Sequence, residues 1–228
     1  MTAPSIEMAS SRAALAALAA DEIAAALRAA IAAHGRASFA AAGGSTPGET
    51  YDALSRAELD WAHVDVTLTD ERWVDVRSPQ SNERMLRERL LVHAARAACF
   101  TPLKGRRGGV EDGAKAADRA VRALAPFDVT LLGVGEDGHF ASLFPGHAVA
   151  TQGLDPHGAR FCIAVAPASP APDLPRVSLT LAALLQSALI VVLATGEAKR
   201  RVIEAPGDTP LAHLFKAART PVRVLWAA

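Results

Sequence analysis

Cysteine is nearly absent from this 228-residue sequence, which contains only Cys99 and Cys162. The two residues lie far apart in the chain, and neither belongs to a C-x-x-C pattern. This scarcity argues against a disulfide-stapled secreted domain and against a metal site built on cysteine thiolates. We expect both thiols to be small buried hydrophobic groups in a protein of a reducing compartment.

A net charge and a long uninterrupted apolar run are also missing. The 24 Lys and Arg residues balance the 24 Asp and Glu residues, so no overall field attracts nucleic acid or an acidic membrane. The Ala-rich stretch 13–33 contains Asp21, Glu22 and Arg28, which prevents it from spanning a membrane. The N-terminus also lacks the charged-then-apolar order of a signal peptide. These absences predict a cytoplasmic protein without nucleic-acid or membrane partners, in which any anionic ligand is bound by a local group of donors.

Half of the residues are hydrophobic, and they form short strand patterns that alternate with helical patterns. The predicted strands cover residues 37–42, 64–68, 127–132, 160–165, 188–194 and 222–226. Helices are predicted over 10–34, 81–95 and 112–124, and further helices are predicted to begin at Thr46, Ser178 and Thr195. This alternation is typical of a Rossmann-like α/β fold, with a mostly parallel sheet and helices on both faces. Because no linker or repeat is visible, we expect one domain over residues 1–228.

Polar or glycine-rich segments follow three of the predicted strands, over residues 43–47, 70–73 and 133–145. Ligands of open parallel sheets bind beyond the carboxyl ends of the strands. We therefore expect the three segments to meet at one site.

The first segment, Gly43-Gly44-Ser45-Thr46-Pro47, joins a predicted strand to a predicted helix. Its glycines let the backbone approach an anion closely, and the helix N-terminus together with the Ser45 and Thr46 hydroxyls offers donors. The segment fits a phosphate-binding turn. It fits equally well a plain turn in which Thr46 caps the helix.

The third segment begins with residues 133–138, which match the G-x-G-x-x-G dinucleotide fingerprint after a strand. Pro145-Gly146 follow only seven residues after Gly138, too soon for the helix that the fingerprint requires, so we do not expect NAD binding. His139 is placed for general-base chemistry, and Asp137 or another carboxylate could orient its ring. The alternative is a structural loop histidine.

Three cations could hold an anionic ligand at these strand ends. Lys199 lies near the start of a predicted helix, where its charge opposes the helix dipole unless an anion binds there. Arg176 follows a proline-rich connection, and Arg72 lies in the second polar segment. Lys199 could instead belong to a solvated basic face with its neighbours, and Arg72 could form a surface ion pair with Glu71.

Six segments in this order resemble the lactonase branch of the glucosamine-6-phosphate isomerase/6-phosphogluconolactonase family. They are Gly-Gly-Ser-Thr-Pro (43–47), Thr-Asp-Glu-Arg-Trp-Val (69–74), Ser-Asn-Glu-Arg-Met (81–85), Gly-Val-Gly-Glu-Asp-Gly-His-Phe-Ala-Ser-Leu-Phe-Pro-Gly (133–146), Arg-Val-Ser-Leu-Thr (176–180) and Gly-Glu-Ala-Lys (196–199). The central segment is the most specific of them. The sequence departs from the relatives at Asp75, where proline is common, and none of the expected roles depends on that position.

The resemblance implies an enzyme without cofactor or metal that hydrolyses 6-phosphoglucono-δ-lactone to 6-phosphogluconate in the oxidative pentose phosphate pathway. It implies that residues 44–46, Arg176 and Lys199 hold the phosphate of this small lactone. It further implies that Arg72 lines the site and that His139 acts on the lactone. The sequence is compatible with a monomer and leaves the oligomeric state open.

The sister activity of the family, glucosamine-6-phosphate deamination, is the nearest alternative. The deaminases carry Phe-Asn-Glu-Pro where this chain has residues 142–145, and Phe144 cannot replace their ring-opening glutamate. Asp70 matches their enolisation base by position, but a lactonase needs no enolisation; we place Asp70 among the substrate-binding residues and leave its role open. A non-catalytic sugar-phosphate sensor is a further alternative, because it would keep the phosphate site without needing Asp137 and His139.

These residues lead to a mechanistic hypothesis for the lactonase reaction. Neutral His139 takes a proton from the water that attacks C1, and later returns it to the ring oxygen. Arg72 or backbone N–H groups of residues 133–138 stabilise the oxyanion. A covalent nucleophile is not required, because a δ-lactone is already reactive, and Ser142 does not lie in a G-x-S-x-G elbow.

Overall fold

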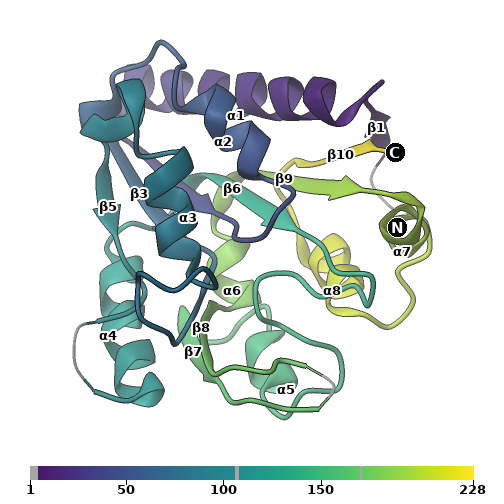
Figure 1. The fold of residues 1–228 in the computed structure, drawn as a ribbon. Helices are drawn as coiled ribbons and strands as arrows, with labels where there is room; N and C mark the ends of the chain where they lie inside the picture. Colours follow the sequence, from purple (N-terminus) through teal and green to yellow (C-terminus); the bar gives the residue numbers. More distant parts are fainter. Residues whose placement is uncertain (1–4, 106–107, 170) are drawn as a thin grey trace.

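The computed structural model describes residues 5–105, 108–169 and 171–228 (Figure 1). Within these ranges, a central sheet of parallel strands has the order β1-β10-β9-β6-β2-β3-β5. Its strands are β1 (Ile6–Met8), β2 (Ala37–Ala41), β3 (Val64–Leu68), β5 (Cys99–Thr101), β6 (Phe127–Gly133), β9 (Ser187–Thr195) and β10 (Val222–Ala227). The predicted Rossmann-like α/β fold is confirmed.

Helix α1 (Arg12–His34) crosses one face of this sheet (Figure 1). Its Ala- and Leu-rich sequence favours a helix, which begins where the Ser11 side chain accepts a hydrogen bond from Ala14 N–H at 3.1 Å. Gly35 ends it in the left-handed conformation, with φ 82°. Buried side chains on one side of α1 pack against the sheet, so the helix predicted over residues 10–34 is confirmed.

The other helices complete the two layers around the sheet. On the α1 side lie α2 (Gly48–Leu54) and α3 (Asn82–Arg89), and the other face carries α4 (Val110–Arg122), α6 (Leu181–Leu184) and α8 (Pro210–Ala217) (Figure 1). The short helix α5 (Ala150–Gly153) and α7 (Glu197–Glu204) lie at the periphery, and 3₁₀ turns cover Trp61–His63 and His93–Ala97. No helix in the described ranges is long and apolar enough to cross a membrane.

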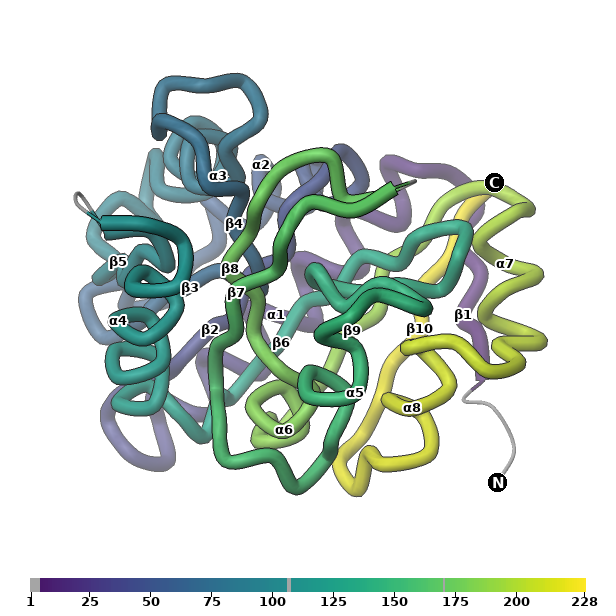
Figure 2. Tube along the Cα trace, turned by 90° about the horizontal axis from the view of Figure 1, so that it is seen from below, coloured from purple at the N-terminus to yellow at the C-terminus, as the bar shows by residue number. Residues whose placement is uncertain are grey.

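A smaller antiparallel sheet, formed by β4 (Asp70–Arg72), β8 (Arg176–Leu179) and β7 (Cys162–Val165), lies on the face opposite α1 (Figure 2). The helix predicted to begin at Ser178 is wrong, because residues 176–179 continue a strand in which Val177 and Leu179 are fully buried. The helix begins instead at Leu181, where the Thr180 side chain caps it. The antiparallel pairing of β4 with β8 places Arg72 opposite Arg176.

Two further predicted helix starts are wrong. Thr46 does not cap α2, because a turn closed by the Gly48 N–H donating to the Ser45 carbonyl (3.4 Å) leaves Thr46 outside the helix. Thr195 does not cap α7, because its pairing with Ala227 of β10 keeps it in β9, and Gly196 is the N-cap.

The helix predicted over residues 81–95 is shorter than expected. It begins as predicted, with the Ser81 hydroxyl accepting a hydrogen bond from Arg84 N–H at 3.1 Å. It ends at Arg89, and His93 has a φ of 49°. A right-handed helix cannot pass through a residue in that conformation.

Candidate active site

A cavity of about 210 Å³ opens beyond the carboxyl ends of β2, β3 and β6. From β2 the chain continues to β3 and β5 at one edge of the sheet, and it then returns to β6, which neighbours β2 on its other edge. The strand order therefore reverses between β2 and β6, and α/β sheets bind ligands at such a switch point. The three polar segments meet here, as the sequence predicts. Eight of the nine predicted site residues line the cavity: Gly44, Ser45, Thr46, Asp70, Arg72, His139, Arg176 and Lys199.

The turn after β2 presents backbone donors to this cavity. Gly44 has a φ of 95°, a left-handed conformation that glycine adopts at little cost. Within the described ranges, the N–H groups of Gly44, Ser45 and Thr46 donate to no other residue. Free N–H groups and two hydroxyls at one turn form a suitable seat for a phosphate group.

Lys199 lies in the first turn of α7 and lines the same cavity. Partial burial lowers the pKa of Lys199, and the nearby Glu136 opposes that effect while the like charge of Arg12 adds to it. A cation in the first turn of a helix is disfavoured by the helix dipole. An anion bound between Lys199 and the Gly44–Thr46 turn would offset both the burial and the dipole.

His139 and Asp137, the ninth predicted site residue, form a close pair. The His139 Nδ1 lies 2.5 Å from Asp137 Oδ1, and the His139 backbone N–H donates to the same oxygen at 3.2 Å. The ring also packs on Phe144, with 4.5 Å between the ring centroids. A carboxylate bound to Nδ1 fixes the ring orientation and leaves Nε2 available to a reacting group.

Gly135 provides the space for this pair. A Cβ atom on Gly135 would lie 2.2 Å from His139 Nδ1 and 2.4 Å from Asp137 Oδ1. The Gly135 N–H also donates to the His139 carbonyl at 2.9 Å. Gly135 is the second glycine of the segment that matches the dinucleotide fingerprint. Here the absence of a side chain at Gly135 lets the loop pack closely against the His139 imidazole.

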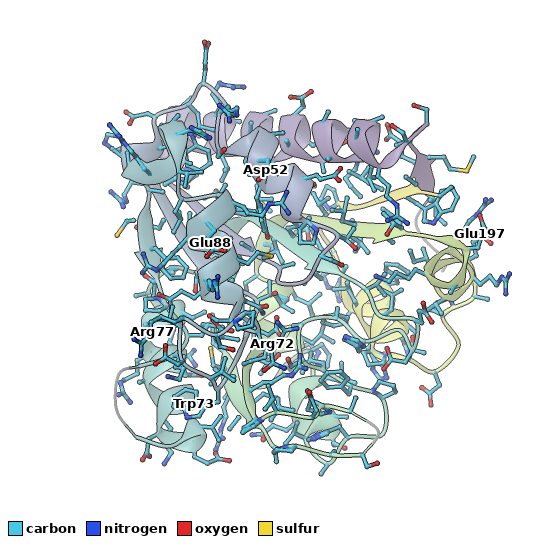
Figure 3. The ribbon with its side chains drawn as sticks, viewed as in Figure 1. Asp52, Arg72, Trp73, Arg77, Glu88 and Glu197 are labelled. Atoms are coloured by element: carbon cyan, nitrogen blue, oxygen red, sulfur yellow. The ribbon has the colours of Figure 1, made fainter. Side chains whose placement is uncertain are left out.

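Arg72 is fixed by hydrogen bonds rather than by the surface ion pair with Glu71. Its Nη1 donates to the Gln80 carbonyl and to Asn82 Oδ1, both at 2.8 Å. In Figure 3, Arg72 lies near the centre of the view, whereas Glu197 of α7 projects from the edge of the molecule. Asn82 is a site residue that sequence reasoning missed, although it lies inside the family-like segment 81–85.

Asp70 and Arg176 face each other beside Arg72. Arg176 Nη1 lies 3.7 Å from Asp70 Oδ2, which also accepts a hydrogen bond from the Ser142 hydroxyl at 2.6 Å. Burial lowers the pKa of Arg176, and the charge of Asp70 partly restores it. The cavity thus contains the cations Arg72, Arg176 and Lys199 against the one carboxylate of Asp70 among its described lining residues, which suits an anionic ligand.

Comparison with known proteins agrees with this geometry. The family model described as glucosamine-6-phosphate isomerases/6-phosphogluconolactonase matches residues 10–225. The chain belongs to this family. The family membership expected from the six sequence segments is confirmed.

Relatives that match nearly the whole chain carry the lactonase name. A 6-phosphogluconolactonase of Caulobacter vibrioides is 48% identical over 92% of this chain and 91% of its own length. A 6-phosphogluconolactonase of Rhizobium meliloti is 40% identical over 94% of each chain. The crystal structure of a 6-phosphogluconolactonase from Shewanella baltica superposes with a TM-score of 0.90, at 35% identity, over 100% of this chain and 98% of that one.

Phe144 stands where the resemblance to the family implies a glutamate in the deaminases. It is buried, with its ring against His139 and 5.3 Å from the Arg176 guanidinium carbon. Ser142 is also fully buried, and its hydroxyl donates to Asp70. Neither residue can supply an acid for ring opening or an exposed nucleophile.

Proposed function

We propose that this chain hydrolyses 6-phospho-D-glucono-1,5-lactone to 6-phospho-D-gluconate, with His139 as the general base. The observation that carries the proposal is that His139, which is paired with Asp137, lines the same cavity as the Gly44–Thr46 turn and three cations. The lactonase name of the relatives supports the choice of substrate. Phe144 argues against the deaminase activity of the family.

The phosphate of the substrate binds the backbone N–H and hydroxyl groups of residues 44–46, together with Lys199. Arg176, which lines the same cavity and lies 3.7 Å from Asp70, adds a second positive charge. Because these residues bind the phosphate at the opposite end of the substrate from C1, they fix the distance between the lactone carbon C1 and His139. Such positioning removes much of the entropic cost of bringing water, base and ester together.

Neutral His139 takes a proton from water through Nε2 while the water oxygen forms a bond to C1. The carbonyl oxygen of the lactone becomes an oxyanion, which the Arg72 guanidinium stabilises. The bond between C1 and the ring oxygen then breaks, and His139 returns its proton to that oxygen. General-base assistance of this kind contributes roughly 10²–10⁴-fold to the rate.

Asp70 lies 3.7 Å from the Arg176 guanidinium and takes a substrate-binding role. Its carboxylate accepts hydrogen bonds from Ser142 and Asn82, which hold it at the cavity wall as an acceptor for a sugar hydroxyl. We further propose that residues 1–228 form one domain and that the enzyme is cytoplasmic; a monomer is compatible with this proposal, which leaves the oligomeric state open. Its partner is the small phosphorylated lactone, without metal, cofactor, nucleic acid or membrane.

The proposal is tested by following hydrolysis of freshly prepared 6-phosphogluconolactone against its spontaneous background, with EDTA present. We expect a large acceleration that EDTA does not change, and no ammonia from glucosamine-6-phosphate. Absence of acceleration would refute the lactonase activity. Release of ammonia would support the deaminase, and loss of activity in EDTA would contradict a metal-free reaction.

A further inference from the structure

Asn82 is the first residue of α3, and its side chain is buried, with 2% of its surface exposed. The side chain lies between two residues of the proposed lactonase site. Its Oδ1 accepts the Arg72 Nη1 hydrogen bond at 2.8 Å, and its Nδ2 donates to the Asp70 carbonyl at 2.8 Å and to Asp70 Oδ1 at 3.2 Å. Asn82 thus connects the cation to the carboxylate.

Only a carboxamide satisfies both neighbours at this position. Its oxygen can accept from a guanidinium while its amino group donates to a carboxylate. An aspartate would keep the acceptor for Arg72 but place a second negative charge beside Asp70. An apolar residue would leave buried polar groups of both neighbours without a partner.

The backbone around Asn82 holds the amide in place. Residues 70–72 form β4, so Asp70 and Arg72 point to one side of the strand and Glu71 to the other. The buried Glu71 carboxylate accepts hydrogen bonds from the N–H groups of Asn82 and Glu83, each at 2.8 Å, and from the Ser81 hydroxyl at 2.9 Å. The Glu71 carboxylate thus connects the first residues of α3 to the side of β4 opposite Asp70 and Arg72.

The phosphate turn also makes room for Asn82. A Cβ atom on Gly43 would lie 2.2 Å from the Asn82 Cγ, Nδ2 and Oδ1 atoms. The amide therefore packs directly on the backbone of the turn that is expected to hold phosphate. Asn82 joins three parts of the cavity wall: the turn, Asp70 and Arg72.

The bonds to Arg72 leave one end of its guanidinium free. Nη1 is occupied by the Gln80 carbonyl and by Asn82, whereas Nη2 donates to no residue in the part of the chain that the structure describes. Arg72 lines the cavity. Fixing Nη1 converts a long, flexible side chain into a donor with a defined direction, which is what oxyanion stabilisation requires.

We propose that Asn82 is a positioning residue of the lactonase site, which acts through Arg72 by holding its guanidinium in the orientation that stabilises the oxyanion. This inference rests on the proposed function, because it assumes that the wild-type chain hydrolyses the lactone. Asn82 lines the cavity, but its Oδ1 is bonded to Arg72 and its Nδ2 is bonded twice to Asp70, so we assign it no bond to the substrate. Its loss should therefore slow the chemical step and leave phosphate binding largely intact.

The test is a double-mutant cycle with Asn82→Ala and Arg72→Met, measured on fresh 6-phosphogluconolactone. We expect Asn82→Ala to lower kcat by about 10- to 100-fold, as a misplaced catalytic group does, with little change in KM. In the Arg72→Met background, Asn82→Ala should cause almost no further loss. Asn82→Asp, which keeps the acceptor for Arg72, should retain more kcat than Asn82→Ala.

Ser81→Ala is the matched control for a merely structural effect. It removes the N-cap of α3 and a hydrogen bond to Glu71, but within the described residues Ser81 forms no hydrogen bond with the Arg72 or Asp70 side chains. The melting temperature and kcat of each variant are measured and compared with those of Ser81→Ala, so that a loss of kcat can be separated from a loss of stability. Additive losses in the cycle, a loss confined to KM, or an equal loss of kcat in Ser81→Ala would each overturn the proposal. A wild-type chain without lactonase activity would instead refute the proposed function.

Discussion

Replacing Gly135 by alanine should disable His139 without altering any functional side chain of the site. Gly135 has no left-handed backbone angle, so alanine can adopt its conformation. The added Cβ, however, would lie 2.2 Å from His139 Nδ1, whereas ordinary contact begins at 3.4 Å. The ring must therefore move by 3.4 − 2.2, or about 1.2 Å, and the hydrogen bond to Asp137 is disturbed at the same time.

A displacement of about 1 Å of a catalytic group costs on the order of 10²-fold in rate. We therefore expect kcat of Gly135→Ala to fall about 100-fold, with KM largely kept because the phosphate site is untouched. The assay is steady-state hydrolysis of fresh lactone, corrected for spontaneous opening. Gly109→Ala serves as the glycine control, because a Cβ there would meet no atom within 4 Å.

The decisive comparison uses a background in which His139 is already absent. If Gly135 acts only by leaving room for the imidazole, Gly135→Ala should have no further effect in a His139→Ala protein. Normal turnover of Gly135→Ala would refute this reasoning. So would an equal loss in both backgrounds, because the glycine would then serve something other than His139.

Other residues give further predictions. Lys199→Ala should raise KM tenfold or more with little effect on kcat, since a hydrogen bond to a charged group is worth about 1.5–3 kcal/mol; a loss confined to kcat would place the phosphate elsewhere. Because burial lowers the pKa of Lys199, KM of the wild type should rise in alkaline solution before an exposed lysine would lose its proton. Burial raises the pKa of Asp118, but two backbone N–H donors and Arg122 outweigh it and hold the pKa below its ordinary value. Its contribution to stability is therefore present above the ordinary pKa of 3.8 and is lost as the pH falls below it. Asp118→Ala should lower the free energy of unfolding in urea by about 1–3 kcal/mol at pH 7, and an unchanged value would contradict this role. Glu71→Gln should also destabilise the fold by about 1–3 kcal/mol, because its amide NH₂ would face donors where the carboxylate accepts four hydrogen bonds; a more stable variant would show that the cost of the buried charge is larger than these bonds.

Much of the fold could be predicted because its strongest signals are local. The Ala-rich periodicity of α1 and the apolar runs of β6 and β9 depend on neighbouring residues alone. The site followed from one further rule, that the carboxyl ends of parallel strands meet at one edge. This rule brought Gly44, Arg72 and His139 together before their distances were known.

The features that escaped prediction depend on contacts between distant residues. The pairing of β4 with β8 joins residues about a hundred positions apart. Because of this pairing, Ser178 lies in a strand and does not begin the predicted helix. Strands β1 and β5 have three residues each, too few to show a period. Cys99 of β5 is exposed, so the prediction that both thiols are buried is wrong for Cys99 and right for Cys162. Thr195 resembles a helix cap until its pairing with β10 is known.

Two site residues were missed for the same reason. The role of Asn82 arises from residues 10 and 12 positions earlier in the chain, so no local pattern reveals it. Gly135 could be recognised only as part of a misleading fingerprint, because its function depends on where the His139 ring lies. Both residues lie in family-like segments, which was the one signal that could have identified them.

The turnover number of His139→Ala on fresh 6-phosphogluconolactone, with spontaneous hydrolysis subtracted, is the most direct measurement. Loss of the base predicts a fall in kcat of roughly 10²–10⁴-fold, with KM largely kept by residues 44–46 and Lys199. Turnover close to that of the unmodified enzyme would contradict the account, because the proton would then be taken from water by another group.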